Sequence, residues 1–267
     1  MQRAVTLQTS EGIARILFRR PEAGNAIDLQ FGREFREATE RAMAAPETRV
    51  LVMAGEGKNF CVGGDLKAML ASGVDVSAYL EDLTRDLHAG IINLYRGPAP
   101  VIAAVNGTAA GAGLGLVLAA DIAIAARSAK FVAAYTAVGL SPDAGSTFAL
   151  PRTIGRTRAT DMLLNNRVLD APTALSWGLV SEVVEDARLA EAVDVNAAKL
   201  AAGPKQAFSA TKRLLDQSLR GLADQLEQES GSIAARGDSA EGREGIQAFV
   251  AKRPPDFRKA ARGESGA

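Results

Sequence analysis

The sequence contains very little cysteine and histidine. Among its 267 residues there is one cysteine, Cys61, and one histidine, His88. One cysteine cannot form a disulfide within the chain, and one cysteine with one histidine cannot supply the ligands of a typical His/Cys zinc site. The sequence therefore excludes an intramolecular disulfide framework, and we expect no bound metal.

The chain also lacks net charge and a long uninterrupted apolar segment. Its 31 basic residues balance 31 acidic ones, so the overall charge favours neither nucleic acid nor an anionic membrane as a partner. The residues after Met1 lack the apolar core of a secretion signal, and the apolar stretch 101–126 is broken by Asn106, several glycines and Asp121. We therefore expect a cytoplasmic protein without a membrane span.

Hydrophobic residues make up 47% of the chain, which is enough for a substantial core. Helix-like patterns lie between apolar runs typical of strands up to about residue 185, and the chain after Pro204 is helical in pattern. This alternation predicts an α/β core. The strand-like runs are residues 5–9, 13–18, 50–54, 101–105, 122–126, 131–133 and 179–184, and the clearest helical segments are 28–45 and 76–95.

The segment from Pro100 to Asp121 combines a buried strand with a glycine-rich turn. Residues 101–105 form the strand, and Asn106-Gly107 ends it before a run of small residues that becomes helical near Leu114. The N-terminus of a helix has unpaired backbone N–H groups and the positive end of the helix dipole. Because the surrounding side chains are small, a ligand can approach this backbone closely. The segment thus predicts a main-chain site for an anion or an oxyanion.

Two other turns supply further groups. The glycine-rich loop of residues 55–66 also leads into a helix, and the turn of residues 138–147 carries Asp143 at its tip. Backbone donors stabilise an enolate oxygen, and a carboxylate moves the proton whose loss forms the enolate. Together the three turns predict proton transfer next to a carbonyl group.

Each turn also has a simpler interpretation. Asp143 has the position of an N-cap for a helix beginning near Ala144, and glycines in residues 106–113 permit close packing without any ligand. The same glycines match the Gly-x-x-x-Gly-x-Gly turn of short-chain dehydrogenases, which carry it after their first strand together with a downstream Tyr-x-x-x-Lys. Here the turn lies in mid-chain, and Gly139 stands four residues after Tyr135. A nicotinamide enzyme is nevertheless kept as an alternative.

Several segments, taken in order, resemble the crotonase or enoyl-CoA hydratase/isomerase superfamily. They are Arg20-Pro21 with Asn25-Ala26, and residues 60–66, 100–121, 128–131, 139–150, 177–180 and 243–253. The resemblance implies an α/β fold in which a spiral of ββα units, residues 1–200, precedes a C-terminal helical assembly region, residues 201–267. It also implies an acyl-CoA thioester as substrate, no separate cofactor, and a homotrimer or homohexamer.

The resemblance assigns roles to individual residues. It implies that the backbone N–H groups of Gly64 and Ala112 hold the thioester oxygen. Tyr135 and His88 match positions near the substrate in relatives. The residues implied to contact coenzyme A are Arg20, Ala26, Val62, Asp65 and Leu66, together with Phe249 and Lys252, whose equivalents often belong to a neighbouring subunit.

The resemblance also bears on the reaction. The hydratases activate water with two glutamates, and Gly115 and Tyr135 occupy those positions here, which disfavours hydration. Asp143 matches the acid of isomerase-type members, most like the ring-1,2-epoxyphenylacetyl-CoA isomerase type, and one carboxylate is enough to move a proton between two carbons. We therefore expect Asp143 to be the catalytic group of an enoyl-CoA isomerase.

Other activities stay open at this point. The same segments are similar to 4-chlorobenzoyl-CoA dehalogenase, in which the aspartate matching Asp143 is a nucleophile and the position of His88 holds a catalytic histidine. That enzyme has a tryptophan at the position of Tyr135. The alternatives to isomerisation are thus hydration, dehalogenase-like hydrolysis and a non-catalytic acyl-CoA-binding protein.

Overall fold

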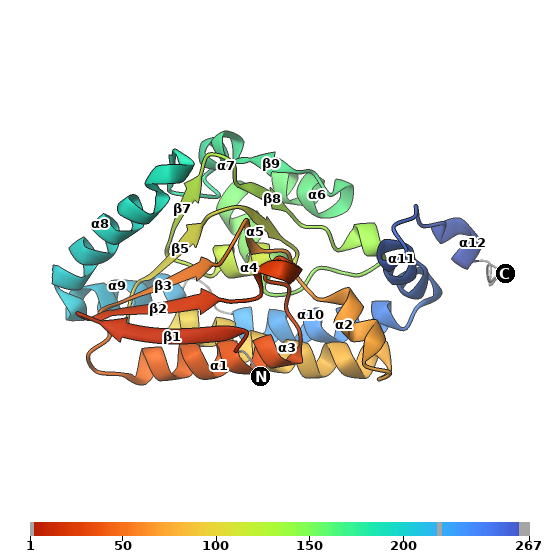
Figure 1. Cartoon of the computed structure of the whole chain (residues 1–267), viewed down its shortest axis with the longest axis horizontal. Coiled ribbons are helices and arrows are strands. Elements are labelled where there is room, and N and C mark those ends of the chain that lie inside the picture. The colour runs from red at the N-terminus through yellow and green to blue at the C-terminus, as the bar shows by residue number, and fades with distance from the viewer. Residues whose placement is uncertain (1–2, 218–220, 262–267) are drawn as a thin grey trace.

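The larger of two sheets has six strands in the order β1-β2-β3-β5-β7-β10 in the computed structural model, which describes residues 3–217 and 221–261 (Figure 1). β1 and β2, both predicted as strands from the sequence, form a hairpin and run antiparallel, whereas all other neighbouring strands in this sheet are parallel. The strands are Val5–Ser10 (β1), Ile13–Phe18 (β2), Val50–Gly55 (β3), Val101–Val105 (β5), Ile122–Ala126 (β7) and Glu182–Val184 (β10).

Helices cover both faces of this sheet (Figure 1). One face packs against α1 (Leu29–Ala44) and α3 (Val76–Arg96) through a core that includes ring contacts of Phe18 with Phe31 and Phe35. The alternate strand residues, such as Val52, pack against α8 (Leu189–Ala202) on the other face. Because both faces are buried, the central strands are nearly continuous apolar runs.

The smaller sheet, in the order β4-β6-β8-β9, positions the loops that follow its strands. Its strands are Asn59–Cys61 (β4), Thr108–Ala110 (β6), Lys130–Val132 (β8) and Leu169–Asp170 (β9). β4 leads into α2 (Leu66–Ala71), and β6 leads into α4 (Ala112–Leu118). Since β4 and β6 are parallel neighbours, the loops after them meet at the same edge of the sheet.

The remaining helices lie between the later strands and in the C-terminal part of the chain. α10 packs along α3, and α11 and α12 extend from one end of the molecule (Figure 1). These helices are α5 (Ser146–Ile154), α6 (Arg156–Asn165), α7 (Ala171–Trp177), α9 (Lys205–Gln217), α10 (Leu222–Gly237), α11 (Ala240–Val250) and α12 (Phe257–Ala261), with short 3-10 turns η1 (Pro21–Ala23), η2 (Thr136–Val138) and η3 (Asp186–Arg188).

The structure corrects several predicted boundaries. α4 begins at Ala112 rather than near Leu114, and the strand predicted over residues 179–184 covers only the last three of them. The capping interpretation of Asp143 is wrong, because α5 begins at Ser146 and Gly145 is its N-cap. None of the helices within the described residues has the length and apolarity needed to cross a membrane.

Candidate active site

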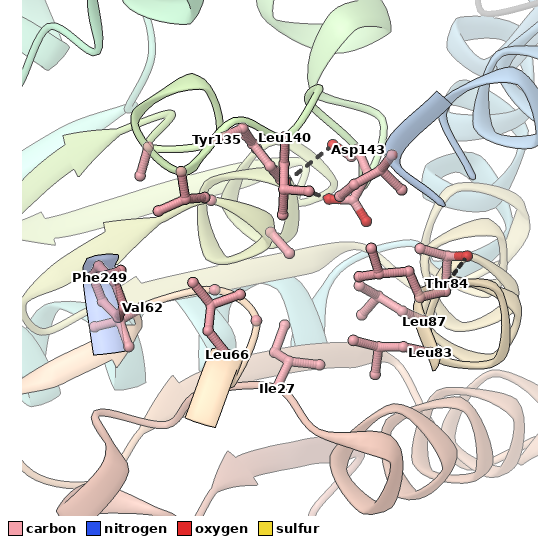
Figure 2. Close-up of a pocket in the computed structure, with 18 residues that line it drawn as sticks. Ile27, Val62, Leu66, Leu83, Thr84, Leu87, Tyr135, Leu140, Asp143 and Phe249 are labelled. Atoms are coloured by element: carbon pink, nitrogen blue, oxygen red, sulfur yellow. Dashed lines mark hydrogen bonds between the residues drawn. The ribbon is translucent and has the colours of Figure 1, made fainter. Parts of the chain in front are cut away.

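A cavity of about 110 Å³ lies beside the loops that follow β4 and β6 (Figure 2). Val62, Leu66 and Phe249 lie at one end of it, where Val62 is 36% and Phe249 58% exposed. The buried side chains of Leu83 and Leu87, both from α3, lie at the opposite end. The cavity therefore has an open mouth and a closed, apolar end.

Gly64 and Ala112, from the two adjacent loops, both line this cavity. Gly63 permits the close approach of these loops: it has a φ of 89°, and a Cβ on it would lie only 3.0 Å from the carbonyl oxygen of Ala110. Within residues 3–217 and 221–261, neither the Gly64 N–H nor the Ala112 N–H donates a hydrogen bond to another protein group. Two unpaired donors on one cavity are the arrangement that stabilises an oxyanion.

Asp143 is the one carboxylate among the described residues that line the cavity. The side chain is 4% exposed, and its Oδ1 accepts a hydrogen bond from the hydroxyl of Tyr135 (Figure 2). Burial raises the pKa of Tyr135 well above its ordinary value, and the negative charge of Asp143 acts in the same direction. Tyr135 thus stays protonated and holds one oxygen of the carboxylate.

His88 lies behind the turn that carries Asp143 and is not among the residues lining the cavity. Its Nε2 lies 3.6 Å from Oδ2 of Asp143 and accepts the backbone N–H of Ala144 at 3.4 Å. Both contacts of His88 are thus with the turn that carries Asp143. A catalytic role of His88 stays a prediction.

The Asp143 turn rests directly on α4 at Gly115. A Cβ on Gly115 would lie 2.6 Å from both the Cβ and the carbonyl oxygen of Ala144, a distance at which neighbouring atoms must shift. The sequence has glycine at position 115, where the hydratases have a glutamate. The structure adds a steric reason why a side chain does not fit at this position. Any side chain at this position displaces the turn that carries Asp143.

A second buried carboxylate, Glu229 on α10, was not predicted from the sequence. Its side chain is 3% exposed and accepts the backbone N–H groups of Gly145 and Thr147 at 2.6 and 3.0 Å. Burial raises the pKa of Glu229 above its ordinary value, the hydroxyl of Thr147 opposes the shift, and the charge of Asp143 adds to it. The site thus contains two carboxylates, of which only Asp143 lines the cavity.

The sequence did contain a signal for Glu229. Leu222, Leu226 and Ile233 mark the buried face of α10. Position 229 follows Leu226 by three residues and precedes Ile233 by four, so it lies on that same face. An acidic residue within an apolar helix face is a reason to look for a buried hydrogen-bonding role.

Comparison with known proteins places the chain in a family. A family model described as "Enoyl-CoA hydratase/isomerase" matches residues 8–260. The chain belongs to the enoyl-CoA hydratase/isomerase family. It is 42% identical over 254 residues to a Rhodobacter capsulatus protein named "Probable enoyl-CoA hydratase", and this match covers 95% of the chain and 97% of that protein.

Two further members of the family are similar over nearly their whole length. The 1,2-epoxyphenylacetyl-CoA isomerase of Escherichia coli K12 is 36% identical over 262 residues, which cover 96% of the chain and 99% of that protein. The solved structure of an enoyl-CoA hydratase from Mycobacterium avium subsp. paratuberculosis matches with a TM-score of 0.85 at 30% identity, covering 95% of the chain and 98% of that structure. These matches confirm the predicted superfamily and the crotonase-like fold, and they leave no basis for the nicotinamide interpretation.

The residues that the family resemblance assigns to coenzyme A fall into two groups. Val62, Leu66 and Phe249 lie at the cavity mouth, whereas Arg20, Ala26 and Asp65 are not among its lining residues. Arg20 donates to the carbonyl oxygen of Ala26 at 2.6 Å and forms ion pairs with Asp65 at 2.9 Å and Asp28 at 3.0 Å. These bonds tie the loop after β2 to the N-terminus of α2.

Lys252 lies just beyond α11, where it is exposed and has a φ of 54°. It does not line the cavity, although Phe249 from the end of the same helix does. The roles of Lys252 and of the other residues in contacting coenzyme A remain predictions.

Proposed function

We propose that this enzyme shifts the double bond of an enoyl-CoA thioester and that Asp143 carries the proton. The observation behind the proposal is one buried carboxylate on a cavity that also holds two unpaired backbone donors, at Gly64 and Ala112. Such donors stabilise the negative charge that develops on a thioester oxygen when the neighbouring carbon loses a proton.

The proposed reaction needs one base acting twice. Asp143 removes a proton from the carbon next to the thioester carbonyl of a β,γ-unsaturated substrate, and the electron pair moves onto the thioester oxygen to give a dienolate. The protonated Asp143 then returns the proton to the γ-carbon while the double bond forms between the α- and β-carbons. No atoms are gained or lost, and no cofactor beyond the coenzyme A of the substrate takes part.

Three features favour isomerisation over the addition of water. The described part of the cavity wall offers one carboxylate where two-carboxylate hydration needs a pair. Position 115 has no room for a second carboxylate, because Ala144 occupies that space. Tyr135 occupies the position of the second hydratase glutamate. Its hydroxyl donates a hydrogen bond to Asp143 and is not a base that could activate water.

The shape of the cavity suggests how the substrate lies. We infer that the coenzyme A chain enters between Val62 and Phe249 at the mouth and that the acyl group extends toward Leu83 and Leu87 at the closed end. The relatives include proteins named as hydratases and as isomerases, so this assignment of the reaction rests on the geometry of the site. We also propose that the enzyme is a homotrimer or a homohexamer.

The Asp143→Asn variant tests the proposed chemistry. Asparagine keeps the shape of the side chain and removes its basicity, so we expect the variant to lose both double-bond isomerisation and exchange of the substrate α-proton with deuterated solvent. Its affinity for butyryl-CoA, measured by calorimetry, should stay close to that of the parent. Asp224→Asn, an exposed carboxylate on α10, is the matched control and should behave as the parent.

Other results would point to other activities. Isomerisation at the parent rate by folded Asp143→Asn contradicts the role of Asp143. Rapid addition of water to an α,β-unsaturated acyl-CoA, without movement of the double bond, would show the enzyme to be a hydratase. Acyl-CoA binding without any proton exchange would favour the non-catalytic alternative.

A further inference from the structure

The turn that carries Asp143 has an unusual backbone and lacks a cap of its own. Ala144 and Gly145 both have positive φ angles, of 55° and 75°. A left-handed conformation is unfavourable for alanine by roughly 1–2 kcal/mol. Gly145 is the N-cap of α5 and has no side chain to accept the first N–H groups of that helix. Other groups must therefore hold this turn in place.

Glu229 supplies the missing cap from a different helix. Its Oε2 accepts the N–H of Gly145 at 2.6 Å, and its Oε1 accepts both the N–H of Thr147 at 3.0 Å and the hydroxyl of Thr147. Gln225, one turn earlier on α10, donates to the same hydroxyl at 2.6 Å. A carboxylate accepting backbone N–H groups at a helix N-terminus forms charge-assisted hydrogen bonds and also interacts favourably with the helix dipole.

The geometry separates this role from direct catalysis. Ile233 is the one described residue of α10 that lines the cavity, and Glu229 is not among the lining side chains. The carboxylate of Glu229 instead reaches the backbone two residues after Asp143. Removal of its carboxylate would leave the buried N–H of Gly145 and the partly buried N–H of Thr147 without their acceptors, which costs more than an unmade bond at the surface.

We propose that Glu229 is a positioning residue for Asp143: from α10 it fixes the turn of residues 143–147 so that the Asp143 carboxylate stays at the cavity. This inference rests on the proposed function for its effect on the rate. The C-terminal helices then contribute to the reaction as well as to any assembly.

The test compares Glu229→Gln with Glu227→Gln, an exposed glutamate on the same helix. Glutamine has nearly the same size but only one acceptor oxygen, so at least one N–H of the turn loses its partner. We expect kcat for isomerisation of a β,γ-unsaturated acyl-CoA to fall on the order of 10²-fold, the size of effect that a small misplacement of a catalytic group produces. The affinity for butyryl-CoA should change little, because Glu229 does not line the cavity.

Hydrogen exchange gives a readout that does not depend on the reaction. Backbone amides of residues 144–147 should exchange faster in Glu229→Gln than in the parent, whereas Glu227→Gln should leave both exchange and kcat unchanged. Glu229→Ala, which removes every acceptor, should show larger effects in the same direction.

The outcomes distinguish this inference from the proposed function. Parent-like kcat and parent-like amide exchange in folded Glu229→Gln would overturn the positioning role. An unchanged kcat with faster exchange would likewise overturn it, because the turn would then move without consequence for the proton transfer. If the parent itself adds water instead of shifting a double bond, the proposed function fails. The positioning role is then tested by comparing Glu229→Gln with the parent in two measurements, kcat for the addition of water and amide exchange of residues 144–147.

Discussion

Among single residues, Gly115 determines where Asp143 can lie. The backbone of Ala144 occupies the space in which a side chain at position 115 would begin, so Gly115→Ala must push the turn away. We expect this variant to lose about 1–3 kcal/mol of unfolding free energy, as overpacked cores do, and to isomerise more slowly. Urea denaturation and a rate assay would measure the two effects.

Gly231 on α10 provides the control for this substitution. A Cβ on Gly231 would meet no atom within 4 Å, so Gly231→Ala should raise stability by about 0.5–1 kcal/mol through helix propensity alone. Equal and small effects of the two alanine substitutions would show that the turn is not packed against α4 as described.

Asp143 was predicted from the sequence and Glu229 was not, because the two residues lie in different contexts. Asp143 stands in a short turn between apolar segments, where an acidic side chain is conspicuous. Glu229 stands in a helix rich in polar residues, where its buried position becomes visible only once Leu222, Leu226 and Ile233 are assigned to the same face. No sequence pattern indicated that its partners are backbone groups of α5.

Among the helices and strands, α4 matters because its first residue, Ala112, carries one of the two proposed oxyanion donors. Proline is compatible with the first position of a helix, where its missing N–H leaves no intrahelical bond broken. Ala112→Pro should therefore fold and yet lose one donor, with turnover falling on the order of 10²-fold or more. Turnover and thermal unfolding of Ala112→Pro would be compared with Ala112→Gly, which keeps the N–H. Parent-like turnover of the folded proline variant contradicts the oxyanion role.

Long, buried strands were predicted from the sequence more accurately than short ones. The central strands of the large sheet are buried on both faces, and their apolar runs predicted them almost to the residue. β4, β6 and β9 have two or three residues each, too few to show any periodicity, so most of the small sheet was not predicted. This sheet brings the loops of Gly64 and Ala112 together, and for that reason the sequence suggested the donors without showing how they meet.

On the scale of the whole molecule, the site draws on both parts of the chain predicted from the family resemblance. Gly64, Ala112 and Asp143 come from the first 200 residues, whereas Ile233 and Phe249 come from the C-terminal helices and line the same cavity. α11 reaches the cavity by packing closely on the turn η2, where a Cβ on Gly245 would lie 2.4 Å from the carbonyl carbon of Val138. The C-terminal helices therefore shape the active site within one chain.

The predicted association of several copies would need apolar surface that one chain leaves exposed. Large apolar side chains are exposed on three separate helices: Leu164 on α6 is 66% exposed, Val195 on α8 63%, and Leu214 on α9 67%. Covering such side chains stabilises an assembly by roughly 25 cal/mol per Å² of apolar surface buried. We expect light scattering coupled to gel filtration to give three or six times the mass of one chain. Phe249 at the cavity mouth is 58% exposed in the single chain, so a neighbouring copy could contact it. We therefore also expect turnover per chain to fall on dilution below the association range. A monomer with full activity at every concentration would contradict this prediction while leaving the roles of Asp143 and Glu229 intact.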